Sequence, residues 1–232
     1  MKHLFPSLLT LTLLSSSNLA LAKSASCDSA ITKGDVCSIQ ISDVHPTQFS
    51  VGMIEVDEKR VEIEEMTDKK IKKFLKKHTI PTVIGPRHQF FMTDHHHLSR
   101  ALFDAGIGEI NLDIQEDWSS LPDATFWQKM DRSHLVYLFD EEGRGPFSPD
   151  QLPRDVNHLA DDIYRSLAWA VQKQTGAYED TNSPYGSFLW ANYFRTRVSR
   201  EIVKNDFTRA VNEGAIHARS TEARDLPGYL GH

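Results

Sequence analysis

The chain has 232 residues, of which 26 are Lys or Arg and 32 are Asp or Glu, and its formal net charge is −6. Such a mildly acidic chain has no overall electrostatic attraction for nucleic acid. A polyanionic ligand would therefore have to be held by a local basic patch. This excludes proteins that coat nucleic acid through their net charge.

The first 22 residues have the pattern of a secretory signal peptide. A short basic head that contains Lys2 is followed by an apolar run and by the small residues Ala20 and Ala22, the usual order before a cleavage position. The apolar run is too short and too interrupted for a spanning helix; an uncleaved amphipathic anchor is the alternative. We therefore expect residues 1–22 to be removed, leaving a periplasmic or secreted protein with no membrane association.

The two cysteines of the chain, Cys27 and Cys37, lie just after the expected cleavage position. In an oxidising compartment, a close pair of this kind predicts a disulfide that closes a short loop. By chain entropy such a loop stabilises the fold by about 2–3 kcal/mol. Two free thiols are the alternative, and the spacing is not that of a metal site.

Residues 23–145 have the mixed pattern of an α+β domain. The stretch 38–66 contains short β-like runs around a turn at His45-Pro46. The patterns that follow predict alternating helices and strands: a lysine-rich helix over 67–78, strands over 80–85 and 90–94, a helix over 97–106 that ends at Gly106, and strands over 107–114 and within 133–146.

Residues 146–232 are expected to form a mainly helical region packed on that domain. Apolar residues four positions apart mark two helices, over about 158–174 and 187–203, and a weaker pattern marks a third over 205–218. The fold class predicted for the whole chain is therefore α+β.

Asp94, His95, His96 and His97 stand where the second of the apolar strands ends and the short helix begins. The backbone N–H groups at a helix N-terminus favour an anion, and His96, His97 and Ser99 would add polar donors to a phosphate cradle. Asp94 could orient an imidazole or accept a proton. A purely structural polar turn is the simpler alternative.

A metal site is the second alternative for the histidine run. Neighbouring side chains diverge, so three adjacent histidines do not readily bind one ion, and the sequence contains no second cluster of spaced ligands. The cofactor is left open, with a divalent metal as one option.

Several segments together resemble the ParB/sulfiredoxin superfamily, specifically its ParB-like putative nuclease branch. They are HPTQFSVG, then TVIG and QFFMTDHHHLSRAL, and later DDIYRSLAWAVQ, FLWANYFRTR and LPGY, so the resemblance covers about residues 39–230. It implies a ParB/sulfiredoxin-like N-terminal domain whose strand–helix motif binds the phosphates of a nucleotide or nucleic acid. No obligate protein partner is evident.

The resemblance places Asp94, His96 and His97 on the acidic residue and the two histidines of the motif. His95 stands where glycine is usual, and Leu98 stands where the motif has an arginine. Losing that arginine removes a bidentate phosphate ligand, which disfavours a sulfiredoxin-like phosphoryl transfer. Arg100 or Arg165 would have to replace it.

Three further features have two interpretations each. Gln48 lies in the segment that the resemblance places beside the motif, where it would contact the substrate; otherwise it belongs to a turn set by Pro46. Asp161 and Asp162 precede Arg165 at helical spacing, which predicts an ion pair that either orients Arg165 towards an anion or joins the two regions. The lysine-rich helix is interpreted as a solvated surface rather than a nucleic-acid interface.

The leading hypothesis is an exported hydrolase of phosphodiester bonds, most simply a nuclease. His96 or His97 would be the general acid or base, Asp94 would orient it, and Arg100 or Arg165 would stabilise the developing charge. A non-catalytic module that binds an anion or nucleotide is the alternative, and a phosphotransferase of the same superfamily is the third hypothesis.

Overall fold

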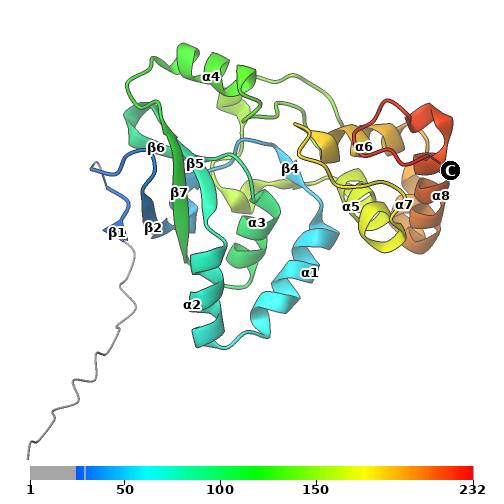
Figure 1. The fold of residues 1–232 in the computed structure, drawn as a ribbon, viewed down its shortest axis with the longest axis horizontal. Coiled ribbons are helices and arrows are strands. Elements are labelled where there is room, and N and C mark those ends of the chain that lie inside the picture. Colours follow the sequence, from blue (N-terminus) through cyan, green and yellow to red (C-terminus); the bar gives the residue numbers. More distant parts are fainter. Residues whose placement is uncertain (1–24, 29, 232) are drawn as a thin grey trace, which may run out of the picture.

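A mixed six-stranded β-sheet organises the first half of the part of the chain that the structure describes, residues 25–28 and 30–231 of a computed structural model (Figure 1). The sheet order is β1-β2-β7-β5-β6-β3. The strands are β1 (Ala25–Ser26), β2 (Val36–Gln40), β3 (Val44–His45), β5 (Ile80–Gly85), β6 (Gln89–Met92) and β7 (Glu109–Asp117). The signal peptide expected at residues 1–22 lies outside the described residues.

The central strands are buried on both faces because their side chains alternate. On β5, Ile80 and Ile84 belong to the core on one face of the sheet, whereas Val83 belongs to the core on the other. β6 alternates in the same way, with Phe90 in the first core and Phe91 in the second. The apolar runs in the sequence therefore mark strands covered on both sides.

Helices cover both faces of this sheet. The first core includes buried residues of α1 (Met53–Glu64) and α3 (His96–Asp104), and α2 (Asp68–Lys77) packs at its margin through Phe74. The second core is closed by α4 (Asp123–Arg132) through Phe126 and Met130. This arrangement places the beginning of α3 at the end of the central strand β6.

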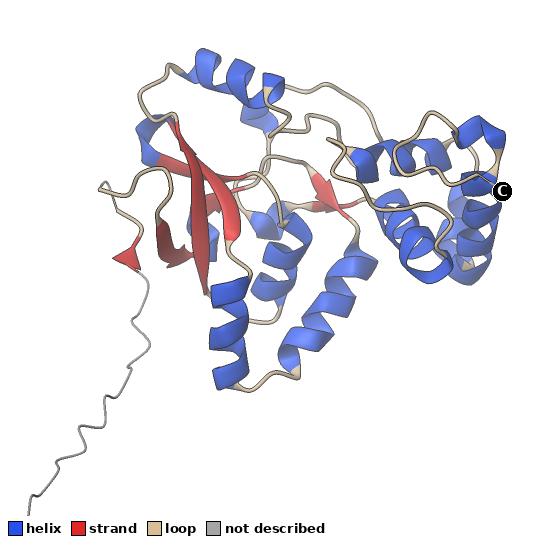
Figure 2. Cartoon of the chain, viewed as in Figure 1, coloured by secondary structure: helices blue, strands red, loops and turns tan. Residues whose placement is uncertain are grey.

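A separate helical region follows the sheet (Figure 2), with strands in red on one side of the molecule and a group of blue helices on the other. Its core is formed around α5 (Ile163–Thr175), which packs against α6 (Gly186–Arg195) and α8 (Phe207–Arg219), with α7 (Arg200–Asn205) beside α8. Trp190 and Phe194 are fully buried in this core. These aromatic residues of α6 therefore belong to the core of the helical region.

A short parallel pair of strands joins the two regions. β4 (Ser50–Val51) pairs with β8 (Ala160–Asp161), and each strand leads directly into a helix, α1 and α5 respectively. Gly52 lies at this junction: a Cβ atom there would be 2.6 Å from the backbone nitrogen of Ser166. The starts of α1 and α5 thus approach each other closely.

Several predicted elements are confirmed and others are wrong. Helix α2, strands β5, β6 and β7, and helices α3, α5 and α8 lie where the pattern predicted them. Residues 53–64 form α1 rather than β-like runs, and the predicted helix over 187–203 is divided into α6 and α7. Helix α4 was not predicted. Within 133–146 the strand is wrong, because the pairing there is an isolated bridge from Tyr137 to Gln48.

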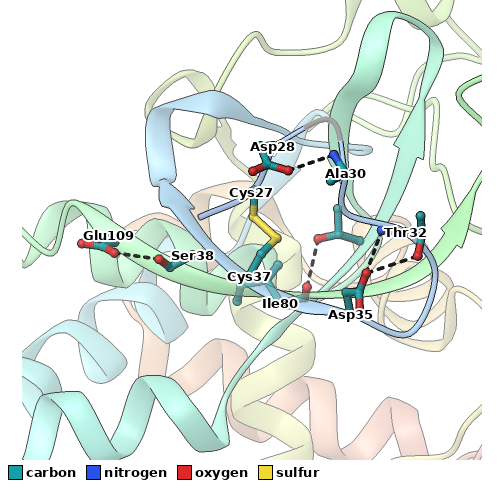
Figure 3. The surroundings of a disulfide bond; sticks show 10 residues. Cys27, Asp28, Ala30, Thr32, Asp35, Cys37, Ser38, Ile80 and Glu109 are labelled. Atoms are coloured by element: carbon teal, nitrogen blue, oxygen red, sulfur yellow. Dashed lines mark hydrogen bonds between the residues drawn. A yellow bond between two sulfur atoms is a disulfide. The ribbon is translucent and has the colours of Figure 1, made fainter. Parts of the chain in front are cut away.

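The predicted disulfide is confirmed. Cys27 and Cys37 are bonded (Figure 3), with their Cα atoms 5.0 Å apart, and this bond ties the loop before β2 to the edge of the sheet. Cys37 is buried against the first core. Across residues 25–28 and 30–231, no helix combines the length and the apolar character needed to cross a membrane.

Candidate functional site

A cavity of about 600 Å³ lies between the sheet region and the helical region. Its first wall comes from segment 47–55 and from the turn between β6 and α3; its second wall comes from residues 134–137, from α5 and from the segment that leads into α6. The cavity contains Asp94, His96, His97, Arg165 and Gln48 among its lining residues. Residues far apart in the sequence therefore meet at one place.

The turn before α3 determines which of the three adjacent histidine side chains line the cavity. His95 caps the helix in the left-handed conformation (φ 61°, ψ 26°), the position where the related motif has glycine. The exposed Asp94 supports this turn, since its Oδ1 accepts a hydrogen bond from the backbone N–H of His95 at 2.6 Å. A left-handed residue costs about 1 kcal/mol or more outside glycine. The turn therefore separates the ring of His95, which does not line the cavity, from those of His96 and His97.

His96 is held by the backbone of the first wall. Its Nε2 accepts a hydrogen bond from the backbone N–H of Thr47 at 3.1 Å, and the side chain is 4% exposed. Burial, reinforced by the charge of Arg165, lowers the pKa of His96 to about 3. The ring is therefore neutral, and because Nε2 is an acceptor its proton is on Nδ1.

His97 is held in the same way one residue further on. Its Nε2 accepts from the backbone N–H of Gly52 at 3.0 Å, and burial, followed by the charge of Arg165, keeps its pKa well below the ordinary value. The same nitrogen is 3.4 Å from Oε2 of Glu55. In the described part of the chain, neither His96 nor His97 has a hydrogen-bond partner at Nδ1.

The expected orientation of these rings by Asp94 is wrong. The hydrogen bonds that hold them come from the amides of Thr47 and Gly52, whereas Asp94 bonds to the backbone of His95. A backbone N–H can only donate, so the nitrogen that it contacts, Nε2, must be unprotonated and the proton must be on Nδ1. A carboxylate at the same place would instead require a proton on Nε2.

Arg165 enters the cavity from α5 and is only 6% exposed. Its Nη1 donates to the carbonyl of Ser50 at 3.3 Å, its Nη2 to Oγ of Ser187 at 3.4 Å, and its guanidinium lies 3.8 Å from the centre of the Phe188 ring. Its Nε has no partner, and among the described residues no carboxylate forms an ion pair with it. Burial lowers the pKa of Arg165, although the guanidinium stays protonated.

Gln48 also lies at the cavity, in line with the expectation for its segment. Its side chain is buried, and its Nε2 donates to the carbonyl of Ser50 at 2.7 Å. Ser50 therefore receives donors from both Gln48 and Arg165. This shared carbonyl links the segment before α1 to the arginine of the second wall.

Ser99 and Arg100 lie elsewhere. Ser99 is fully buried within α3 and its Oγ has no partner. Arg100 bonds to Asp104 at 2.9 Å and to three backbone carbonyls between residues 156 and 159, which makes it a structural clamp. Neither residue lines the cavity, so we do not include them among the phosphate ligands.

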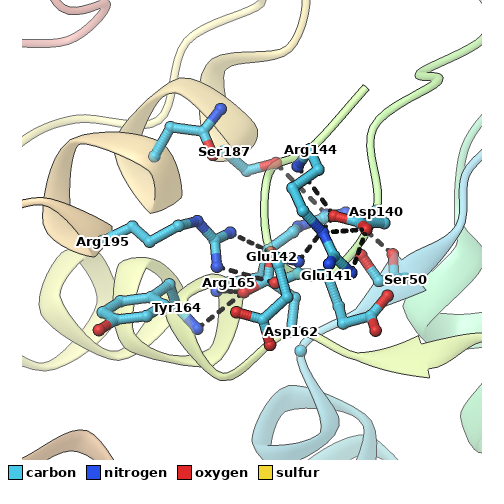
Figure 4. A network of polar contacts seen from close by, with 12 residues as sticks. Ser50, Asp140, Glu141, Glu142, Arg144, Asp162, Tyr164, Arg165, Ser187 and Arg195 are labelled. Atoms are coloured by element: carbon cyan, nitrogen blue, oxygen red, sulfur yellow. Dashed lines mark hydrogen bonds and ion pairs between the residues drawn. The ribbon is translucent and has the colours of Figure 1, made fainter. Parts of the chain in front are cut away.

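The predicted ion pair between Asp161 or Asp162 and Arg165 is wrong. Asp162 caps α5 by accepting from the backbone N–H groups of Tyr164 and Arg165, and its other oxygen pairs with Arg195 at 2.7 Å (Figure 4). Asp161 accepts from the backbone N–H of Met53. Asp162 thus positions Arg165 through the helix cap and forms no direct ion pair with its guanidinium.

Glu55 is a lining residue that the sequence analysis did not single out. It lies in the first turn of α1 and reaches His97 because α1 packs against α3. A local pattern cannot reveal such a contact. As for cofactors, no group of three or more His, Cys, Asp or Glu residues in the described ranges is arranged to hold a metal ion.

Comparisons with known proteins give one family and one similar solved structure. The model of the family described as "Putative ParB-like nuclease" matches residues 37–196. Among solved structures, protein Atu1540 from Agrobacterium tumefaciens is similar, with 36% identity, a TM-score of 0.79, and coverage of 85% of this chain and 97% of that one. A search of the curated proteins found no match.

Proposed function

The chain belongs to the ParB-like nuclease family, and from this membership we propose that it is an exported phosphodiesterase, most simply a nuclease, that holds the substrate phosphate at Arg165. Nucleic acid or a nucleotide is then the partner.

The observation that carries the proposal is the buried guanidinium of Arg165, which lines the cavity without a direct ion pair among the described residues. A buried charge that lacks a directly paired counter-ion is costly; Asp162 and Glu55 stabilise this one only from a distance, and its Nε has no partner. A phosphate oxygen would supply both the missing charge and the missing acceptor. This arginine takes the place of the one absent at Leu98.

The two neutral histidines would complete the anion site. The Nδ1–H groups of His96 and His97 are donors without partners, so they are available to phosphate oxygens, and fixed donors of this kind stabilise charge that develops during the reaction. Asp94 lies exposed at the rim, and the side chain of Gln48 supports the carbonyl that also binds Arg165. The histidines then act as donors rather than as bases.

The same geometry favours one alternative, an anion-binding module without catalysis. The Nε2 lone pairs of both histidines are occupied by backbone amides, so neither ring is free to take a proton at that atom. The two functions predict the same ligand and differ only in turnover.

The test is to incubate the protein without residues 1–22 with plasmid DNA, RNA and bis(p-nitrophenyl) phosphate, each with Mg²⁺, with Mn²⁺ or with a chelator. We expect cleavage that falls about 100- to 1,000-fold in Arg165→Met. We expect the variant to remain folded, because methionine keeps an unbranched side chain in the buried site and removes a buried charge that has no direct ion pair. Arg209→Met, which changes an exposed arginine of α8, is the matched control.

Each outcome decides between the two functions. Binding of the diester without turnover in any metal condition supports the module. Neither binding nor turnover, or equal activity in Arg165→Met and the wild type, contradicts the proposed site altogether.

Export remains part of the proposal. The disulfide between Cys27 and Cys37 fits an oxidising compartment, and the leader pattern supports secretion. Expression with a periplasmic fractionation and mass measurement should give a product that lacks residues 1–22 and contains no free thiol. A full-length product in the cytoplasmic fraction would contradict export.

A further inference from the structure

We propose that Glu55 is the proton-exchanging group of the cavity and, in the hydrolysis proposed above, the general base that activates water. The second half of this statement rests on the proposed function. The first half stands on geometry alone and is tested separately.

The position of Glu55 gives it access to the bound phosphate. It lines the same cavity as Arg165 and His97, and its side chain is 17% exposed. One carboxylate oxygen, Oε1, lies 3.3 Å from the ammonium of Lys59 one helical turn away. The other oxygen, Oε2, lies 3.4 Å from Nε2 of His97. The ammonium therefore holds Oε1, while Oε2 lies against the ring of His97.

The contact with His97 increases the affinity of Glu55 for a proton. The single lone pair of His97 Nε2 accepts the N–H of Gly52, so this nitrogen carries no hydrogen that it could donate to Oε2 of Glu55, 3.4 Å away. The partial negative charge of the nitrogen is unfavourable beside a carboxylate oxygen, and a proton on Oε2 reduces this repulsion. Proton uptake at Glu55 is thus favoured locally.

Burial and the surrounding charges together determine the pKa of Glu55. Burial is the largest effect and raises its pKa, while Lys59 on the same helix and Arg165 and Lys173 on α5 oppose that rise. From α3 it faces the neutral His97. A phosphate bound at Arg165 would offset the charge of that arginine and raise the pKa of Glu55 further, so binding and proton uptake are coupled.

Other acceptors at the cavity are less suited to this role. His96 and His97 carry their protons on Nδ1 and have their Nε2 atoms occupied. Asp94 is exposed and bonds to the backbone of its own turn. A general base works best with a proton affinity matched to the working pH, which favours the buried carboxylate of Glu55.

In the hydrolytic step, Glu55 acts in the complexes in which it is unprotonated: its carboxylate accepts one proton from a water molecule as the water oxygen forms a bond to phosphorus. The bond between phosphorus and the leaving oxygen breaks, and that oxygen takes a proton from solvent at the mouth of the cavity. Glu55 then returns its proton to solvent. One diester and one water give one phosphate monoester and one alcohol, with Arg165 holding the phosphoryl oxygens throughout.

The first experiment is kinetic. Glu55→Gln keeps the size and polarity of the side chain, and we expect kcat for the cleaved diester to fall about 100- to 10,000-fold with little change in KM. The acidic limb of the pH–rate profile should disappear as well. Glu62→Gln, an exposed glutamate on the same helix, should change neither.

The second experiment needs no turnover. Diphenyl phosphate, a singly charged diester, is titrated into the protein by calorimetry in buffers with different ionisation enthalpies. We expect the wild type and Glu62→Gln to take up a fraction of a proton on binding, up to one per site. Glu55→Gln should lose this uptake and bind the anion more tightly above neutral pH.

The two experiments fail in different ways. Absence of turnover in the wild type overturns the proposed hydrolysis, and proton uptake that depends on Glu55 still supports its role as the proton-exchanging group. Uptake that is unchanged in Glu55→Gln overturns the inference about Glu55, even where the wild type cleaves diesters.

Discussion

The two walls of the cavity are held in place by different kinds of contact. In the first wall, the rings of His96 and His97 are fixed by backbone amides of Thr47 and Gly52. In the second wall, Arg165 is positioned by side chains from elsewhere in the chain, through Asp162 and its partner Arg195. Backbone amides are present whatever side chain a residue carries, so most substitutions in the first wall should leave its hydrogen bonds intact. The second wall depends on the side chains of Asp162 and Arg195, and replacing either one removes the ion pair.

The largest effect should follow from breaking the second wall at Asp162. This carboxylate is 3% exposed, caps α5 and pairs with Arg195, whose Nε already has no partner. We expect Asp162→Ala to lower the free energy of unfolding by about 3–5 kcal/mol, because a buried arginine loses its counter-ion. Urea denaturation measures this change.

The matched control for that substitution is Asp206→Ala. Asp206 caps α8 through the backbone N–H of Arg209 and makes no buried ion pair in the described structure. Its loss should cost about 1 kcal/mol. Equal losses for the two variants would show that capping alone explains Asp162 and that the charged network does not hold the second wall.

An intermediate effect is expected where the two walls meet at Gly52. An added Cβ atom would lie 2.6 Å from the backbone nitrogen of Ser166 and 2.9 Å from its Oγ, so α1 must move away from α5. We expect Gly52→Ala to destabilise the fold by about 1–3 kcal/mol and to weaken anion binding, because Gly52 also holds His97. Thermal unfolding and calorimetry report the two changes.

Gly186→Ala is the control for this crowding. Gly186 begins α6, and the nearest atom to its added Cβ would be a side-chain carbon of Pro227 at 3.6 Å, an ordinary contact. Its stability should be unchanged or slightly higher, since alanine favours a helix. A Gly52→Ala variant as stable as this control would show that the junction is loose.

A more gradual effect concerns the pH response of the first wall. The pKa of His96 is about 3 in the folded protein and 6.5 for the ordinary group, so between these values the unfolded chain binds more protons. The free energy of unfolding therefore falls as pH decreases from about 6.5 towards 3, by at most about 1.4 kcal/mol per pH unit from this group. Glu55, with its raised pKa, acts in the opposite direction above about 4.5.

His96→Gln should reduce this slope in urea titrations between pH 6 and pH 4. An unaltered slope in His96→Gln would contradict the neutral, buried state of the ring, and with it the assignment of His96 as a donor.

Much of the fold could be predicted because its elements follow local patterns. The strand over 80–85 and the helices α3, α5 and α8 have apolar residues at the spacing of their structure, and the disulfide follows from two cysteines close together. α1 could not be predicted this way, since its β-branched residues Ile54 and Val61 are exposed and only Val56 and Ile63 are buried.

The candidate site was predictable in part, through residues of both walls. Asp94, His96 and His97 could be identified as a group because they are adjacent, and the structure brings Gln48 and Arg165 to the same cavity. Glu55 and the pairing of Asp162 with Arg195 depend on how helices pack. Helical spacing favoured Arg165 as the partner of Asp162. Asp162 instead caps α5 with one oxygen and pairs with Arg195 of α6 through the other.

The histidine run has one practical consequence. Three consecutive histidines ordinarily suggest a handle for immobilised nickel, which imidazole binds through an available ring nitrogen. Here the Nε2 atoms of His96 and His97 accept backbone amides and Nδ1 of His95 is buried. Folding therefore conceals most of the chelating capacity of the run, and retention of this segment on such a resin would report that the turn has opened.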